Sequence, residues 1–266
     1  MKILFCGDVV ARPGREVVSK LLPGLRRKTR ADFVIVNGEN AADDGLGLTL
    51  PAYRGILDAG ADAVTMGNHT FDKPEILPAM DDPHLVRPLN YPARTPGHGF
   101  YIREVKGVRV CVLQLLGSLW MKGAGESPFA AADAFIKAHR ADYDILIVDF
   151  HAEATSEKIA MGYCLDGRAA LVVGTHTHVP TADARILPKG TGYITDAGMC
   201  GDGNSVIGMT PETAISRFIG VEKRLASADG EGSFCGVLVD ADARTGLARG
   251  ITPVSAGIPL AKKDKV

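Results

Sequence analysis

The chain contains 266 residues, of which 46% are hydrophobic and 23% charged, and its 30 Lys and Arg residues against 31 Asp and Glu residues give a net charge of −1. This composition is close to the globular average and excludes a disordered chain, a coiled coil and a collagen-like repeat. The balanced charge also argues against a protein that binds nucleic acid through a strongly basic surface.

The first part of the chain alternates short apolar runs with helical patterns. The apolar runs cover residues 3–6, 33–36 and 63–66, and the helical patterns cover residues 14–28 and 50–59. Continuous apolar runs, rather than alternating ones, are typical of parallel strands that are buried on both faces. We therefore expect β-α-β units in this part of the chain.

The later elements are more varied. Residues 100–105 and 108–116 flank Lys106-Gly107 and predict a hairpin. We expect helices at residues 128–141, 155–165 and 211–219, and strands at residues 145–148, 170–173, 184–187, 192–195, 235–240 and 247–251. The absence of a repeat or linker predicts one domain, residues 1–266, of the α/β (α+β) class. Its strands form one mixed sheet or two sheets stacked face to face, with helices outside.

The cysteine pattern and the termini bear on location. The five cysteines are scattered and form no Cys-x-x-Cys pair: Cys6, Cys111, Cys164, Cys200 and Cys235. This pattern argues against a disulfide framework and favours a reducing, cytoplasmic location. The N-terminus does not resemble a secretory signal, and no apolar stretch reaches the ~18 residues of a membrane-spanning helix, so no membrane association is expected. The tail at residues 262–265 is expected to be a solvated end.

Five of the apolar runs end in polar clusters that could share one site. These clusters are Asp8, Glu39 with Asn40, Asn68 with His69, His151, and His176 with His178. In an open α/β sheet, ligands bind at the carboxyl ends of the strands, so these side chains can converge although they are far apart in sequence. All of them offer oxygen or nitrogen and none is a cysteine, which suits a borderline divalent ion such as Mn, Fe, Co or Zn.

The clusters together hold more donors than one ion needs, which favours two ions that share a carboxylate. Two metals about 3.5–4 Å apart are typical of many enzymes that hydrolyse phosphoric esters. Each cluster alone also has a simpler interpretation as a helix cap, a turn or a satisfied core histidine. His176 and His178 fit that interpretation least well, because histidines two positions apart point to the same side of an extended segment.

Two further features have a functional and a structural interpretation, and the sequence leaves both open. Arg12 lies four residues after Asp8 and could contact a phosphate, or it could be a solvated loop charge. The glycine-rich stretch at residues 117–125 holds the only tryptophan, Trp120, and could be a lid or base-stacking loop or an ordinary surface loop. We assign no chemistry to the remaining histidines, which are His84, His98 and His139.

These motifs resemble those of the calcineurin-like metallophosphoesterase superfamily. The matching pieces are Gly7-Asp8, Gly38-Glu39-Asn40, Gly67-Asn68-His69, His151 and Gly174-Thr175-His176-Thr177-His178. Residues 1–14, 37–41 and 87–92 resemble one branch more closely, the bacterial YmdB-like phosphodiesterases that act on cyclic nucleotides. Val10 stands where the superfamily usually has histidine, and Glu39 where it usually has aspartate. The YmdB-like branch is similar in both respects, so these departures strengthen the match to it.

The resemblance implies a role for each matching residue. Asp8, Glu39, Asn40 and His178 would hold a first metal ion. Glu39, Asn68, His151 and His176 would hold a second, with Glu39 as the bridge between the two. His69 would be a proton donor rather than a ligand. The implied fold is a four-layer αββα sandwich, in which two stacked mixed β-sheets are flanked by helices, and the implied metals are iron or manganese.

The donor clusters and this resemblance together imply a metal-dependent phosphodiesterase. The resemblance implies 2′,3′-cyclic nucleotides as substrates and leaves 3′,5′-cyclic nucleotides open as a second substrate class. A hydroxide that bridges two metal ions would attack phosphorus, and His69 would act as the general acid. The alternatives are a phosphomonoesterase or nucleotidase on the same site, and a metal-bound regulatory or RNA-binding protein. The expected partner is a small phosphodiester, with an RNA-derived substrate and a homo-oligomer both left open.

Overall fold

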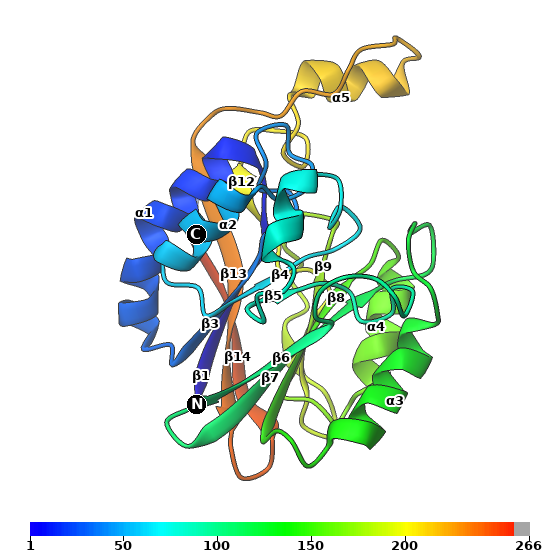
Figure 1. Cartoon of the computed structure of the whole chain (residues 1–266). Coiled ribbons are helices and arrows are strands. Elements are labelled where there is room, and N and C mark those ends of the chain that lie inside the picture. Colours follow the sequence, from blue (N-terminus) through cyan, green and yellow to red (C-terminus); the bar gives the residue numbers. More distant parts are fainter. Residues whose placement is uncertain (258–266) are drawn as a thin grey trace.

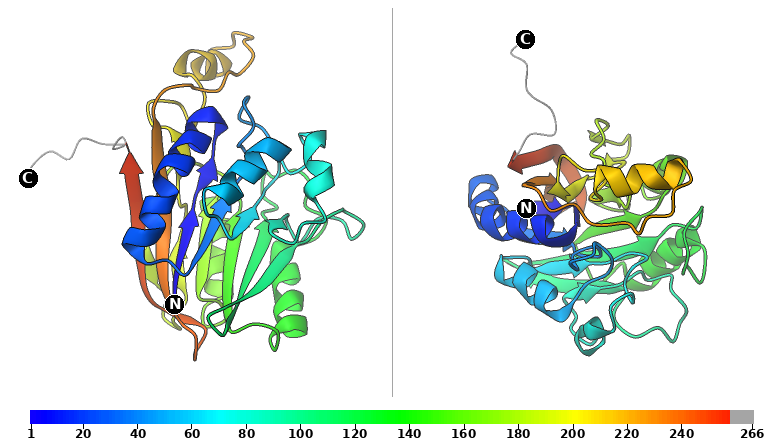
Figure 2. Two further views of the ribbon diagram at one scale, coloured as in Figure 1. Left: turned by 60° about the vertical axis from the view of Figure 1, so that its left-hand side comes forward. Right: turned by 90° about the horizontal axis from the view of Figure 1, so that it is seen from above.

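The computed structural model describes residues 1–257 and contains two β-sheets stacked face to face between helices (Figure 1). The tail at residues 262–265 lies outside the described residues. Helices α1 (Ala11–Thr29) and α2 (Leu50–Asp58) cover the outer face of one sheet, and α3 (Pro128–His139) and α4 (Thr155–Cys164) cover the outer face of the other (Figure 2). The predicted four-layer αββα arrangement is therefore present.

The first sheet is mixed and has the strand order β2-β12-β13-β1-β3-β4-β5, with β14 beside β13. Its strands are β1 (Lys2–Cys6), β2 (Asp8–Val9), β3 (Phe33–Asn37), β4 (Ala63–Thr65), β5 (Leu85–Val86), β12 (Met199–Asp202), β13 (Gly232–Asp242) and β14 (Leu247–Gly257). Strands β1, β3, β4 and β5 run parallel to one another, whereas β13 pairs antiparallel with β1. The parallel part brings the carboxyl ends of three predicted strands to one edge.

The second sheet has the strand order β10-β11-β9-β8-β7-β6 and is also mixed. Its strands are β6 (Phe100–Val105), β7 (Val108–Leu116), β8 (Ile145–His151), β9 (Leu171–Thr175), β10 (Arg185–Ile186) and β11 (Gly192–Ile194). Strands β6 and β7 form the predicted hairpin, and β7, β8 and β9 are parallel. Two shorter helical elements, η1 (Pro74–Ala79) and α5 (Pro211–Phe218), lie outside the sheets (Figure 1).

The apolar runs are continuous because each central strand is buried on both faces. In β1, Leu4 and Cys6 pack beneath the helices, while Ile3 and Phe5 face the second sheet. Strand β8 repeats this division, with Ile145 and Ile147 between the sheets. Alternate residues of a strand point to opposite faces, so an apolar residue at every position fills two separate cores.

The layer between the sheets changes from apolar to polar at one end. Asp149 follows Ile147 on the same face of β8, and Asn37, Thr65 and Thr175 hold the equivalent last positions of β3, β4 and β9. All four side chains are fully buried. The next residues along the chain leave the strands at this polar end, which is where the predicted site residues lie.

Several elements differ from the sequence-based expectation. Strand β8 extends to His151 and β9 to Thr175, because polar residues continue both strands in the buried polar layer. The short strands β2, β5 and β12 and the helix η1 were not predicted, since two to six residues give too little periodicity to detect. Helix α1 begins at Ala11, whereas its apolar periodicity indicates a start at residue 14, and it continues through Pro23.

No helix within residues 1–257 is both long enough and apolar enough to span a membrane.

Candidate metal centre

The structure brings all eight predicted site residues into one network of contacts at the carboxyl ends of the strands. Asp8 begins β2, His151 ends β8, and the other six lie in the turns that follow β3, β4 and β9. They are Asp8, Glu39, Asn40, Asn68, His69, His151, His176 and His178. The parallel strand directions bring about this convergence, as the sequence predicted.

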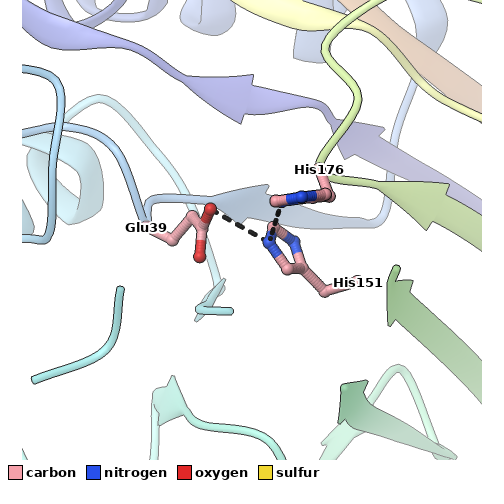
Figure 3. Close-up of side chains that lie close together, drawn as sticks. All are labelled: Glu39, His151 and His176. Atoms are coloured by element: carbon pink, nitrogen blue, oxygen red, sulfur yellow. Dashed lines mark hydrogen bonds and ion pairs between the residues drawn. The ribbon is translucent and has the colours of Figure 1, made fainter. Parts of the chain in front are cut away.

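Glu39, His151 and His176 form the centre of this network (Figure 3). Nε2 of His151 lies 3.0 Å from Oε1 of Glu39 and 3.1 Å from Nδ1 of His176. One donor atom from each of the three residues lies within 4.8 Å of the others. Oδ1 of Asn68 lies 3.1 Å from the same Nε2 of His151. These four side chains therefore present oxygen and nitrogen atoms to one small volume.

A second group of donors lies next to the first and meets it at Glu39. Nδ2 of Asn40 lies 3.1 Å from Nε2 of His178 and donates to Oε1 of Glu39 over 3.0 Å. Oδ1 of Asp8 lies 3.8 Å from the same nitrogen of His178. Glu39 thus touches both groups, and Asp8 of the second group also approaches the first, because its Oδ1 lies 3.8 Å from Nδ1 of His151.

Three observations fit the site to metal ions. The donors are carboxylate, amide and imidazole groups, which suit a borderline divalent transition metal. Oδ1 of Asn40 is buried and has no hydrogen-bond partner among the described residues, so an oxygen lone pair remains available. A side chain at Gly67 would clash with Glu39 and His151, so the glycine leaves space directly beside these two donors.

Burial and neighbouring charges shift the pKa of several of these side chains. Burial raises the pKa of Asp8 to about 6. Burial acts in the same direction on Glu39, but the charge and hydrogen bond of His151 outweigh it and lower the pKa of Glu39 to about 2. Burial alone would lower the pKa of His151, but the charge and hydrogen bond of Glu39 outweigh it and raise this pKa to about 8. Burial, helped by the charge of His151, lowers the pKa of His176 to about 3, so its imidazole is neutral.

The outer nitrogen of His151 is fixed by a chain of hydrogen bonds. Nδ1 of His151 lies 2.9 Å from Oγ1 of Thr175, and this hydroxyl donates to Oδ1 of Asp149 over 2.7 Å. Oδ2 of Asp149 accepts hydrogen bonds from Asn37 and Thr65 in the other sheet. Because the hydroxyl of Thr175 donates its hydrogen to Asp149, its oxygen accepts a hydrogen bond from Nδ1–H of His151. The other ring nitrogen of His151, Nε2, therefore faces the site.

The other two histidines are oriented in the same manner. Nε2 of His176 lies 3.1 Å from Oε2 of Glu153, so Nδ1 faces His151. Nδ1 of His178 donates to the carbonyl oxygen of Ile207 over 2.8 Å, so Nε2 faces Asn40. Partners of this kind set which nitrogen of an imidazole is available to a metal.

The segment that carries His176 and His178 is not extended, which corrects the sequence-based expectation. Both residues have left-handed backbone conformations, with φ of 91° for His176 and 63° for His178. The two rings therefore do not share one side but belong to the two different donor groups described above. Non-glycine residues adopt this conformation at a cost of order 1–3 kcal/mol each, so the surrounding structure must hold it in place.

A buried ion pair holds this segment. Nζ of Lys158 in α4 lies 2.9 Å from Oδ2 of Asp196, and both side chains are fully buried. The same carboxylate accepts from the backbone and the hydroxyl of Thr177, which lies between the two histidines. Lys158 also donates to this hydroxyl. The pair therefore fixes the middle residue of the strained segment.

His69 lies beside the donor groups rather than among them. Its Nδ1 is 2.7 Å from Oδ2 of Asp72, and its backbone N–H donates to Oε2 of Glu39 over 3.3 Å. Within residues 1–257 its Nε2 has no protein partner. The ring is thus oriented by a carboxylate on one side and has a free nitrogen on the other.

The two features that the sequence left open lie away from the centre of the network. Arg12 belongs to helix α1 rather than a loop, and its guanidinium is taken up by ion pairs with Glu16 and Asp229. These contacts favour the structural interpretation of Arg12. The stretch at residues 117–125 contains no helix or strand, and the side chain of Trp120 is exposed.

Sequence reasoning missed the residues that orient the histidines. Asp149 had a usable signal, because it lies two positions before His151 and so shares its face of the strand. The other partners carry no such signal, since they meet the site only through the fold: Glu153, Lys158, Thr175, Asp196 and Ile207.

The chain is similar to proteins that have been named or solved. A model of the YmdB-like protein family matches residues 4–254. The 2′,3′-cyclic-nucleotide 2′-phosphodiesterase of Bacillus subtilis (strain 168) is 49% identical over 247 residues, which cover 92% of this chain and 93% of that protein.

Two solved structures share the fold over nearly the whole length. A hypothetical protein from Thermus thermophilus superposes with a TM-score of 0.91 and 43% sequence identity, and the match covers 97% of this chain and 100% of that chain. A novel phosphatase from Mycoplasma pneumoniae has a TM-score of 0.89 and 38% identity, with coverage of 97% and 93%. The two-sheet fold expected from the sequence is confirmed by these structures.

The ion pair beneath the histidine segment gives a stability prediction. We expect Lys158→Met to lower the free energy of unfolding by about 3–5 kcal/mol, because it leaves Asp196 buried without its cation. The double variant Lys158→Met/Asp196→Asn should lose less than the sum of the two single losses. Urea denaturation measures all of these differences.

A matched control is Lys137→Met, which removes an exposed lysine 2.6 Å from Asp133. Its expected loss is at most about 1 kcal/mol, because exposed ion pairs contribute little. Equal losses for Lys158→Met and Lys137→Met would show that the buried pair does not support the segment.

Proposed function

The chain belongs to the YmdB-like family and is a hydrolase of phosphoric esters, and on this premise we propose that it hydrolyses nucleoside 2′,3′-cyclic phosphates with two divalent metal ions. The observation that carries the proposal is the pair of adjacent donor groups that meet at Glu39. The activity named for the relative from Bacillus subtilis supports the substrate class. Hydrolysis of 3′,5′-cyclic nucleotides is a second activity of the same site in this proposal.

The proposed ligand sets follow the two donor groups. Asp8, Glu39, Asn40 and His178 hold one ion. Glu39, Asn68, His151 and His176 hold the other, and Glu39 bridges them. The unpartnered Oδ1 of Asn40 and the inward nitrogens of the three histidines support this division. Iron and manganese both suit a set of oxygen and nitrogen donors, and we propose that one of them is the metal in the cell.

Such ions, when bound, lower the pKa of a water molecule and neutralise charge on phosphate oxygens. The chain itself provides the proton for the leaving oxygen. Oδ2 of Asp72 holds Nδ1 of His69 at 2.7 Å, so a proton on Nε2 faces away from this carboxylate and is available to the substrate. A ribose hydroxyl is a poor leaving group, so proton donation by His69 matters most for nucleotide substrates.

The remaining parts of the proposal concern location and organisation. All five cysteines are free and four of them are buried, which supports a reducing, cytoplasmic location. A shared apolar core between the two sheets supports a single domain. RNA cleavage that leaves 2′,3′-cyclic phosphate ends would supply substrates of the proposed class.

A phosphomonoesterase is the second candidate, because the relative from Mycoplasma pneumoniae is named a phosphatase and the same metal chemistry serves monoesters. The test is to remove metals with a chelator, reload the protein with Mn²⁺ or Fe²⁺, and supply adenosine 2′,3′-cyclic phosphate or p-nitrophenyl phosphate. We expect metal-dependent cleavage of the cyclic diester and little monoester turnover. Turnover of the monoester alone would favour the phosphomonoesterase, and no turnover of either would overturn both candidates.

The role of His69 gives a separate prediction. We expect His69→Ala to retain the metal content of the wild type and to lower kcat on adenosine 2′,3′-cyclic phosphate by about 10²–10⁴-fold, the usual contribution of a general acid. Elemental analysis and steady-state kinetics measure the two properties. Loss of bound metal would instead identify His69 as a ligand.

The chain offers a matched control for this variant. His139 is paired with Asp142 at 2.9 Å with the same three-residue spacing as His69 and Asp72, but it lies on α3 away from the donor groups. His139→Ala should leave kcat unchanged, so a general effect of losing a His–Asp pair can be separated from loss of the proton donor.

A further inference from the structure

A cavity of about 580 Å³ opens beside the candidate metal centre. It shares Asn68 with that centre, and it is also lined by Asp72, the carboxylate that orients His69. Its remaining walls come from Phe71, from Leu77 of η1, from residues 91, 92 and 94–96, and from Gly123 in the glycine-rich stretch. Cavities of ~300–1,000 Å³ are typical of sites for small ligands.

We propose that this cavity binds the nucleobase of a nucleoside 2′,3′-cyclic phosphate, with the base against the rings of Phe71 and Tyr91. The inference rests on the function proposed above and names a subsite that the metal chemistry does not require. It is carried by the position of the cavity, the chemistry of its walls and the charge at its rim.

The position follows from the direction of the reaction. In hydrolysis, a bond forms between phosphorus and the oxygen of water, the bond from phosphorus to O2′ breaks, and a proton passes from His69 to O2′. The water loses one proton to the solvent, and His69 regains one from the solvent. The product is a nucleoside 3′-phosphate. The leaving oxygen belongs to the ribose, so the nucleoside must lie on the His69 side of the metal centre. The cavity begins on that side, at Asp72 and Asn68.

The walls suit a flat apolar ligand. The ring centroids of Phe71 and Tyr91 are 6.0 Å apart and their planes are tilted by 40°. Leu77, Pro92 and Pro96 complete an apolar lining, and Leu77 is 50% exposed. Aromatic side chains stack on any nucleobase, because every base has a π-face.

The aromatic wall is tied to the catalytic turn. The hydroxyl of Tyr91 donates to the carbonyl oxygen of Gly67 over 2.8 Å, and Gly67 directly precedes Asn68 and His69. A side chain at Gly123 would contact the Tyr91 ring at 3.0 Å, so the glycine-rich stretch lies against the same ring. A base held on this wall is therefore placed at a fixed distance from the site of reaction.

The rim of the cavity carries an unpaired positive charge. Arg94 lines the cavity, is exposed, and makes no ion pair within residues 1–257. The only carboxylate in the lining, Asp72, is already paired with His69. The cavity lining thus holds no unpaired carboxylate, and the free guanidinium of Arg94 is available to stack on the face of a base.

The experiment compares a substrate that has a base with one that has none. Phe71→Ala is assayed on adenosine 2′,3′-cyclic phosphate and on glycerol 1,2-cyclic phosphate. We expect the ratio of kcat/KM between these substrates to fall at least about tenfold, mainly through a higher KM for the nucleotide, because stacking is made equally before and during the reaction. Phe71→Leu, which keeps apolar volume without a flat ring, guards against misfolding and should lower the same ratio.

A binding measurement gives a readout that does not depend on turnover. Calorimetric titration of the metal-loaded protein with adenosine should show binding that weakens at least about tenfold in Phe71→Ala. Phe218→Ala is the matched control, because Phe218 is an 87% exposed phenylalanine on α5, and its substrate ratio and adenosine affinity should equal those of the wild type.

The outcomes separate this inference from the proposed function. An unchanged substrate ratio and unchanged adenosine affinity in both Phe71 variants would overturn the nucleobase subsite while cyclic diester hydrolysis stands. Adenosine binding that depends on Phe71, in a protein that cleaves no cyclic diester, would support the subsite and overturn the proposed function.

Discussion

The carboxyl group of Asp149 lies between the two sheets and accepts hydrogen bonds from both of them. It accepts hydrogen bonds from the hydroxyl of Thr65 over 2.6 Å, from the hydroxyl of Thr175 over 2.7 Å and from the side-chain amide of Asn37 over 3.0 Å. Complete burial raises its pKa to about 7. A buried polar group is stable only when its partners are in place, so this residue fixes the relative position of four strands. Asn37 also accepts from the backbone of Glu39, which extends the constraint to the metal centre.

The metal centre and the cavity depend on different parts of this framework. Strand ends and buried partners hold the side chains of the candidate metal centre, and the left-handed segment with His176 and His178 is held by Lys158 and Asp196. The cavity is built from turns and loops, with Tyr91 as its link to the strand end. Rigid strands suit the precise geometry that the proposed dinuclear centre needs, while loops allow the proposed nucleobase cavity to vary without disturbing it.

Much of the fold and most of the candidate site could be predicted from the sequence. Parallel strands share an edge, so polar residues that end apolar runs, such as Asp8, Glu39 and His151, were correctly expected to meet. Their roles as ligands remain part of the proposal. The residues that orient them were missed, because contacts such as Glu153 with His176 arise only from the three-dimensional arrangement. Strand β8 was predicted too short because Asp149 and His151 are polar, although both are buried in the strand.

The central claim is that Glu39 bridges two metal ions. The most direct measurement is anomalous diffraction from crystals of the protein reconstituted with Mn²⁺, with crystals of Glu39→Ala as the comparison. We expect two peaks roughly 3.5–4 Å apart on either side of the Glu39 carboxylate, and loss of at least one peak in the variant. A single peak in the wild-type protein, or two peaks that persist without Glu39, would contradict the account.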